Sequence, residues 1–332
     1  MAEDTSPQAA DKGTWVTWRQ DIKVLDCSIR DGGLMNDHRF EDGFVRAIYD
    51  TCVAAGIDYM ELGYKSSQRI YAPDEFGAWK FCREDDIRRI VGDNPTQLKL
   101  SVMADVGRTD YHEDIIPADD SIIDMVRVAT YIHQIPGAIE IIQDAHQKGY
   151  ETTVNLMAVS SAHESDVDDA LEAVAQTDVG VIYLVDSFGA FYSEEIEALT
   201  RKYRAITEAS GKQLGIHTHN NQQLAYANTI EGIVNGASYL DATIGGLGRG
   251  AGNCALELLI AFLKNPAYRL RPILECLEKD IAALRQQIEW GYDIPYLITG
   301  MLNQHPREAM RFMDAEPRGS VVEFYDEVME QV

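Results

Sequence analysis

The sequence has few positive charges for its length and no long hydrophobic run. Its 332 residues include 29 Lys and Arg against 54 Asp and Glu, a net charge of −25 at pH 7. So acidic a surface repels the phosphates of nucleic acids and the head groups of anionic lipids. No apolar run reaches the roughly 18 residues of a membrane-spanning helix, and residues 1–13 lack an apolar signal segment. We therefore expect no nucleic-acid or membrane partner.

Cysteine is also sparse. The five cysteines are scattered, odd in number and without Cys-x-x-Cys spacing. This usage is typical of reduced thiols, so disulfide-stapled secreted folds are excluded and a cytoplasmic location is predicted. Because the chain is so acidic, an anionic small-molecule substrate would need a local cluster of positive charge, which a metal ion and an arginine would supply.

From residue 22 to about residue 264, short runs rich in β-branched residues alternate with longer segments of helical period. The expected strands are 22–25, 57–62, 98–103, 122–129, 152–157, 179–185, 213–217 and 239–242. The expected helices include 41–55, 137–148, 165–175, 193–208, 222–235 and 255–263, with a loop over 26–37. Eight strand–helix units predict an α/β fold of the (β/α)8 TIM-barrel type, with an open doubly wound sheet as the alternative.

The chain divides into four expected segments: a lead-in over 1–20, the barrel over 21–265, a short C-terminal helical extension over 266–313 and an acidic, loosely docked tail over 314–332. Asn265-Pro266 marks the boundary after the barrel. The extension carries one apolar stripe, formed by Leu274, Leu277, Ile281, Leu284 and Ile288. Such a stripe packs on its own barrel or forms the seam of a homo-oligomer, and we expect the chain to be a homo-oligomer.

Candidate metal ligands occur at two strand ends. In a strand, residues i and i+2 leave the same face, so His217 and His219 of the run Gly215-Ile216-His217-Thr218-His219 point at one place. The first strand runs into Arg30-Asp31-Gly32-Gly33. Because parallel strands of a barrel converge at one mouth, Asp31 and the two histidines would form a facial ligand set for a divalent metal, Mn²⁺ or Mg²⁺ first and Co²⁺ or Zn²⁺ next.

A glycine-rich loop, 245–252, follows the eighth expected strand and ends at Asn253. It lacks the Lys-Ser/Thr ending of a nucleotide-binding loop. The glycines would let the backbone approach the metal closely. Asn253 would then offer an amide oxygen as a ligand or cap the following helix.

Three runs together resemble the metallolyase superfamily that includes 4-hydroxy-2-oxovalerate aldolase, hydroxymethylglutaryl-CoA lyase and isopropylmalate synthase. They are Leu-Asp-Cys-Ser-Ile-Arg-Asp-Gly-Gly at 25–33, Gly-Ile-His-Thr-His-Asn-Asn at 215–221 and Gly-Leu-Gly-Arg-Gly-Ala-Gly-Asn at 246–253. The region 290–296, with Trp290-Gly291-Tyr292, is most similar to the 4-hydroxy-2-oxovalerate aldolase branch. The resemblance implies metal-dependent cleavage or formation of a carbon–carbon bond of a 4-hydroxy-2-oxo acid, through a metal-bound pyruvate enolate.

The resemblance also implies roles for single residues. Asp31, His217 and His219 would hold the metal, with Asn253 a further ligand, and Arg30 would face the developing enolate oxygen.

Ser187 would contact the substrate carboxylate or carbonyl, and Tyr292 would lie near the substrate in a catalytic role. We also expect Glu61, at the end of the second strand, to bind substrate. The implied partners are a small anionic 2-oxo acid, an aldehyde and an acylating aldehyde dehydrogenase that takes up the aldehyde.

The sequence departs from the aldolases at one position. Their catalytic histidine lies three residues after the metal-binding aspartate, where this chain has Leu34. Loss of a general base costs about 10²- to 10⁴-fold in rate. His38, Tyr64 and a metal-bound water are the candidates to replace it.

Other functions fit the sequence less well. A Claisen-type synthase that uses acyl-CoA would share the metal and Arg30, but it usually carries a longer C-terminal region. Hydroxymethylglutaryl-CoA cleavage is disfavoured because 246–250 contains no cysteine, and biotin-dependent carboxyl transfer because Asn155-Leu156-Met157 offers no lysine. Iron oxygenases with two histidines and a carboxylate usually have an all-β fold. A non-catalytic homologue that retains the metal is the last alternative.

Overall fold

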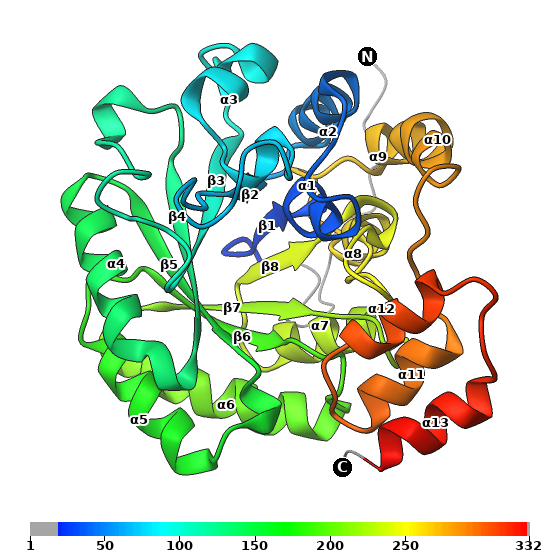
Figure 1. Ribbon diagram of the computed structural model, residues 1–332. Helices are drawn as coiled ribbons and strands as arrows, with labels where there is room; N and C mark the ends of the chain where they lie inside the picture. Colours follow the sequence, from blue (N-terminus) through cyan, green and yellow to red (C-terminus); the bar gives the residue numbers. More distant parts are fainter. Residues whose placement is uncertain (1–18, 331–332) are drawn as a thin grey trace, which may run out of the picture.

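The computed structural model describes residues 19–330, which form a closed barrel of eight parallel strands surrounded by helices (Figure 1). The strands are β1 (Lys23–Asp26), β2 (Tyr59–Tyr64), β3 (Lys99–Asp105), β4 (Met125–Tyr131), β5 (Glu151–Met157), β6 (Val181–Asp186), β7 (Gln213–Thr218) and β8 (Tyr239–Ala242). Each strand pairs with the next, and β8 closes on β1 with Val24 opposite Leu240. The predicted (β/α)8 barrel is confirmed, and the open-sheet alternative is wrong.

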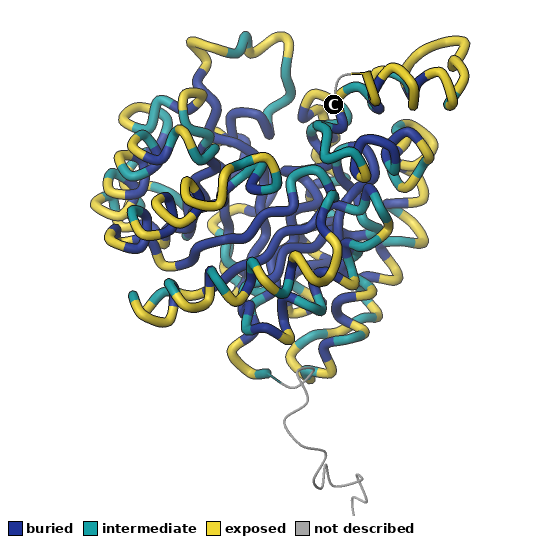
Figure 2. The backbone as a smooth tube through the Cα atoms, turned by 90° about the horizontal axis from the view of Figure 1, so that it is seen from below, coloured by how far each residue is buried: buried dark blue, intermediate teal, exposed yellow. Residues whose placement is uncertain are grey.

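Amphipathic helices cover the outside of the barrel. They are α2 (Asp42–Ala55), α3 (Glu84–Val91), α4 (Ile135–Gln147), α5 (Glu164–Ala175), α6 (Ser193–Ser210), α7 (Ala225–Val234) and α8 (Leu256–Phe262). In α2 the buried residues Val45, Ile48 and Cys52 recur every three or four positions, which makes one apolar face. Figure 2 shows the consequence: the strands in the middle are buried, and exposed positions alternate along the surrounding helices.

The segment predicted as a loop over 26–37 instead contains a buried helix, α1 (Ser28–Gly32), which carries Arg30 and Asp31. The side chain of Asp26 accepts hydrogen bonds from the hydroxyl of Ser28 at 2.6 Å and from its backbone N–H at 3.2 Å. These bonds turn the chain from strand to helix directly after β1. The loop prediction was wrong because this turn leaves no apolar periodicity to read.

The first part of the C-terminal extension packs on its own barrel. It consists of α9 (Leu270–Cys276), a π-helical stretch (Leu277–Ile281) and α10 (Ala282–Leu284). Within the predicted stripe, Ile281 and Leu284 are buried in the chain's own core, whereas Leu274 is exposed. The stripe therefore covers the barrel rather than forming a seam, and the homo-oligomer remains a prediction.

The second part of the extension forms a small separate core. It contains α11 (Ile294–Met301), α12 (Arg307–Asp314) and α13 (Val321–Met329), which Figure 1 shows grouped on the side toward which β6 and β7 point. Phe324 and Val328 of α13 are buried in this core. The prediction of a loosely docked tail is therefore wrong for 321–329. The short apolar face at 321, 324 and 328 lies among acidic residues, which made it hard to recognise in the sequence.

Nearly all of the predicted lead-in, 1–20, lies outside the described residues. Within 19–330, none of the helices combines the length and the apolar character needed to cross a membrane.

Candidate active site

A cavity of about 320 Å³ opens where the strands end, and it is called the mouth below. Residues from most of the strand ends, the glycine-rich loop and the C-terminal extension line it. They include Arg30, Asp31, Leu34, Tyr64, Met103, Asp105, Arg108, Tyr131, Asn155, Met157, Ser187, His217, His219, Arg249, His305, Arg307 and Met310. The mouth is therefore the place where a ligand can reach the predicted metal set.

His217 of β7 and His219, directly after β7, are both oriented by a hydrogen bond at Nδ1, which leaves Nε2 of each ring free of such a bond to the described part of the chain. Nδ1 of His217 lies 3.0 Å from Oδ2 of Asp241, and Nδ1 of His219 lies 2.8 Å from the backbone oxygen of Asp186. Since those oxygens accept, each Nδ1 carries a proton, and each Nε2 is the nitrogen left to face a metal. Burial lowers the pKa of His219 to about 3, so this ring is neutral at pH 7.

Asp31 completes the set from the other side of the mouth. Its Oδ2 lies 3.7 Å from Nε2 of His219, and its Oδ1 pairs closely with the guanidinium of Arg30. Burial opposes ionisation of Asp31, but Arg30 and the two histidines hold its pKa below the ordinary value. Asp31 is therefore an anion at neutral pH.

The backbone of the glycine-rich loop lies directly against the candidate metal ligands. Nδ2 of Asn253 donates to Oδ2 of Asp31 at 2.6 Å, and Oδ1 of Asn253 is buried without a partner among the described residues. A Cβ atom on Gly248 would lie 2.1 Å from Nδ2 of Asn253 and 2.5 Å from Oδ2 of Asp31. Only glycine fits there, which is the physical reason for the close approach that the sequence suggested.

A buried chain of alternating charges connects the two sides of the site. Nε of Arg30 donates to Glu61 at 2.7 Å, and Glu61 also accepts from Arg127 at 2.9 Å. Arg127 in turn donates to Asp241 at 2.5 Å, and Asp241 holds His217. All of these side chains are buried, so in a low dielectric each charge fixes the next.

The residues present fit a divalent metal. Ligand atoms of Asp31, His217 and His219 lie within 4.8 Å of one another, and Nε2 of His219 is buried without a partner among the described residues. One carboxylate and two neutral imidazoles are the ligands that first-row divalent metals take. A second group, Cys27 with His217 and Asp241, fits less well because burial raises the pKa of the Cys27 thiol, which disfavours the thiolate that binds a metal.

Two predicted residues are buried behind the mouth rather than lining it. Glu61 is completely buried between Arg30 and Arg127 and does not line the mouth, so it positions Arg30, and its contact with substrate stays a prediction. His38 is 2% exposed and lies edge-on to the ring of Tyr64, with centroids 5.3 Å apart. Burial lowers the pKa of His38 to about 3. A base with so low a pKa, one ring away from the mouth, does not replace the missing histidine.

Tyr292 also lies elsewhere. It is 40% exposed and lines a separate small cavity with Met35, Trp290 and Tyr296. The indole N–H of Trp290 donates to the backbone oxygen of Gly245 at 3.2 Å, which anchors this turn under the glycine-rich loop. The prediction that Tyr292 lies near the substrate is corrected accordingly.

Ser187 and Leu34 do line the mouth. The hydroxyl of Ser187 accepts from the backbone N–H of Ala158 at 2.8 Å, and its backbone oxygen accepts from Arg249 at 2.9 Å. Leu34 joins a cluster with Tyr64, Met103 and Met157. The wall that would carry the aldolase base is therefore apolar.

Sequence reasoning missed several residues of the mouth. Arg108 and Asp105 lie at the end of β3, His305 lies in the connection between α11 and α12, and Arg307 begins α12. The only signal for the last pair is the polar stretch 303–307 after an apolar helix. Two hydrogen bonds hold the extension over the mouth: Asn303 donates to the backbone oxygen of Ser160 at 2.9 Å, and Asn221 to that of Tyr296 at 3.3 Å.

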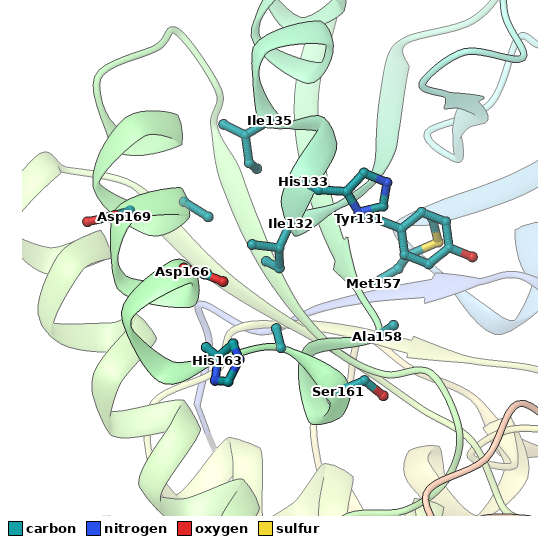
Figure 3. Close-up of a pocket in the computed structure, with 12 residues that line it drawn as sticks. Tyr131, Ile132, His133, Ile135, Met157, Ala158, Ser161, His163, Asp166 and Asp169 are labelled. Carbon is teal, nitrogen blue, oxygen red and sulfur yellow. The ribbon is translucent and has the colours of Figure 1, made fainter. Parts of the chain in front are cut away.

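A second and wider cavity of about 550 Å³ adjoins the mouth. The two cavities share Tyr131, Met157 and Ala158. Figure 3 shows the outer part, where His163 and Asp166 lie apart from these shared residues. This cavity contains none of the predicted ligands.

Comparison with known proteins agrees with the geometry. The family model described as HMGL-like matches residues 21–273. An oxaloacetate decarboxylase of Mycobacterium tuberculosis is 35% identical over 253 residues, which cover 75% of this chain and 71% of that protein. A 4-hydroxy-2-oxovalerate aldolase of Bacillus cereus is 28% identical over 281 residues, covering 81% and 80%.

Solved structures share the fold. The N-terminal domain of a proposed aldolase from Bacteroides vulgatus superimposes with a TM-score of 0.75 at 25% identity, covering 90% of this chain and 98% of that one. The HMG-CoA lyase of Brucella melitensis superimposes with a TM-score of 0.61 at 18% identity, covering 80% and 99%.

Proposed function

The chain belongs to the HMGL-like family, and we propose that it is a divalent-metal-dependent lyase that cleaves a carbon–carbon bond of a 2-oxo acid. The observation that carries the proposal is the convergence of Asp31, His217 and His219 at the mouth beside Arg30. A divalent metal, when bound, supplies the Lewis acid that stabilises negative charge on the 2-oxo oxygen. Mn²⁺ and Mg²⁺ are the proposed metals.

Arg30 is the group of this chain that acts on the same charge. Its Nη1 faces Asp31 and its Nε faces Glu61, so the guanidinium is held in one orientation before substrate arrives. Nη2 makes no hydrogen bond among the described residues and is available to an oxygen of the substrate. A preorganised donor of this kind contributes about 10²- to 10³-fold in rate.

The first candidate reaction is the aldol cleavage of a 4-hydroxy-2-oxo acid to pyruvate and an aldehyde, with an acylating aldehyde dehydrogenase as the proposed partner. It requires a group that removes the proton of the 4-hydroxyl. Apart from Asp31, the only carboxylate that lines the mouth within 19–330 is Asp105, and burial raises its pKa above the ordinary value. We assign this role to Asp105 and test it below.

The second candidate is the decarboxylation of oxaloacetate to pyruvate, which two observations favour. The relative from M. tuberculosis bears that name. In addition, loss of CO₂ needs no base at a hydroxyl, so the apolar wall with Leu34 does not lower the rate of this reaction. In both candidates the electrons of the broken bond move toward the oxygen that Arg30 faces.

The test is release of pyruvate by metal-stripped enzyme, with and without added Mn²⁺, from 4-hydroxy-2-oxo acids and from oxaloacetate, read through lactate dehydrogenase. The background from free Mn²⁺ is subtracted with the His219→Ala variant. We expect metal-dependent pyruvate from one of the two classes. Absence of pyruvate from every compound by metal-loaded enzyme would contradict the proposal, and thiol release from acetyl-CoA would then indicate a condensing enzyme.

Two variants separate the candidates. For an aldolase, Asp105→Asn should lower pyruvate release about 10²- to 10⁴-fold, and Leu34→His should raise it. For a decarboxylase, neither change acts on a required proton, so both variants should keep the rate within a few-fold.

A further inference from the structure

At the outer rim of the mouth, the guanidinium of Arg249 lies against the ring of His305. The backbone N–H of Arg307 donates to Nδ1 of His305 at 3.1 Å. A neutral imidazole whose Nδ1 accepts must carry its proton on Nε2. Nε2 of His305 lies 3.4 Å from Nη1 of Arg249. A guanidinium nitrogen can only donate a hydrogen bond, so with this tautomer both nitrogens are donors. An oxygen anion at this position would accept from both.

The ring of His305 is neutral at pH 7. Burial lowers its pKa to about 4, and the neighbouring charges of Arg249 and Arg307 act in the same direction. The ring packs against Phe188, with centroids 5.7 Å apart.

Arg249 has unused donor capacity. Its Nη2 donates to the backbone oxygen of Ser187, but its Nε is buried without a partner among the described residues. A buried N–H without an acceptor is unfavourable, so a ligand that supplies an acceptor is favoured.

The charges of the rim point the same way. Arg108 pairs with Asp105 at 3.4 Å, whereas Arg249 and Arg307 make no ion pair within residues 19–330. Both of these arginines line the mouth. In addition, α12 begins at Arg307, which brings the positive end of its dipole to the rim.

We infer that Arg249 and His305, with Arg307 beside them, form a subsite for a second anionic group of the substrate. The inference rests on the proposed function and narrows it. The substrate is a 2-oxo acid with a carboxylate or a phosphate at its far end, so that one end reaches the metal side of the mouth and the other reaches the rim.

The test compares ligands of equal length in Mn²⁺-loaded protein. 2-Oxoglutarate and 2-oxopentanoate differ only in a terminal carboxylate or methyl group, and 4-phosphono-2-oxobutanoate carries a phosphonate instead. Isothermal titration should show that a charged end binds about 10- to 100-fold more tightly, the value of hydrogen bonds to a charged group. Whichever of the two anions binds more tightly identifies the terminal group.

Variants assign that preference to residues. His305→Phe keeps the ring but removes the donor and should reduce the preference about tenfold, whereas His305→Gln, which keeps an N–H, should retain most of it. Arg249→Met should abolish it. His163→Phe is the matched control, because this exposed histidine lies in the neighbouring cavity (Figure 3). Equal binding of 2-oxoglutarate and 2-oxopentanoate, or a preference unchanged in both His305→Phe and Arg249→Met, would overturn the subsite.

A second readout does not depend on the proposed function. In metal-free protein at about pH 7, inorganic phosphate should shift the ¹⁵N and ¹H resonances of His305, assigned by their loss in His305→Phe, and should not do so in Arg249→Met. If this shift appears while no 2-oxo acid yields pyruvate, the anion subsite stands and the reaction assignment fails. If pyruvate is released but the resonances of His305 do not shift with phosphate and no terminal group is preferred, the reaction assignment stands and the anion subsite fails.

Discussion

The two sides of the mouth are built on opposite principles. On the inner side, Asp31, Arg30, Glu61, Arg127 and Asp241 form an unbroken series of oppositely charged, buried partners. On the outer side, Arg249 and His305 present donors to each other. Arg249 comes from the glycine-rich loop and His305 from the extension, so neither lies on a strand.

The difference separates what the chain completes by itself from what it leaves to a ligand. Every strong charge of the inner side is matched by another charge of the same chain, so the ligand atoms keep their positions before a metal arrives. The outer side is incomplete in the chain alone. Changes on the inner side should therefore affect metal binding and stability, and changes on the outer side should affect only the choice of substrate.

The largest effect is expected from His219→Ala, which removes a metal ligand. Metal analysis should show no tightly bound Mn²⁺, and pyruvate release should fall about 1,000-fold because the Lewis acid is lost. His163→Ala serves as the control and should bind metal normally. Full metal content in His219→Ala would show that the inner side does not depend on this ligand.

Glu61→Gln should lower the free energy of unfolding by about 3–5 kcal/mol, because it leaves Arg30 and Arg127 buried without their shared anion. Urea denaturation measures the change. Glu308→Gln breaks an exposed ion pair with Arg311 and should cost less than about 1 kcal/mol. Similar losses in the two variants would contradict the view that the inner network is held together by burial.

Asp241→Asn keeps an acceptor for His217 but removes the negative charge behind it. We expect metal affinity to fall about 10- to 100-fold, as for other groups that orient a metal-binding histidine. Competition with a metallochromic chelator measures the affinity. Asp166→Asn, in the neighbouring cavity, should leave it unchanged.

The smallest effect concerns pH. Burial raises the pKa of Asp26 to about 7, from an ordinary value of 3.8. Between these values the folded state binds a proton that the unfolded state does not, so the stability from Asp26 is present at low pH and is lost as pH rises through about 7. Relative to Asp26→Asn, the wild type should lose about 2 kcal/mol between about pH 5 and about pH 7. A difference that does not vary with pH would show that this carboxyl is not protonated in the fold.

Local patterns were sufficient for the barrel and for the inner side of the mouth. Eight apolar strand runs separated by helical periods admit few packings, and the ends of parallel strands meet on one face. Asp31, His217 and His219 lie at such ends, so chain order alone brings them together. The i, i+2 spacing of the two histidines then directs both side chains to the same face.

Two residues that the sequence placed in the site, His38 and Tyr292, do not line the mouth. Their local conformation and packing decided this, and their position in the sequence did not reveal it. His38 lies seven positions from Asp31, yet its left-handed backbone, with φ of 61°, and its burial beside Tyr64 keep it out of the mouth. Tyr292 was inferred from a resemblance in the extension, and the anchoring of Trp290 under the glycine-rich loop directs it to another cavity.

The sequence by itself determined the barrel, the candidate metal ligands and the presence of Leu34 where the aldolases have a histidine, because each depends on a local period or on a position near one strand end. Only the tertiary structure decided that Glu61 lies behind Arg30 and that His305 reaches Arg249, 56 residues away in the chain. Those contacts depend on how α11 to α13 dock on the loops and on which charges are buried together. Both are decided by long-range packing, which leaves no periodic trace in the sequence.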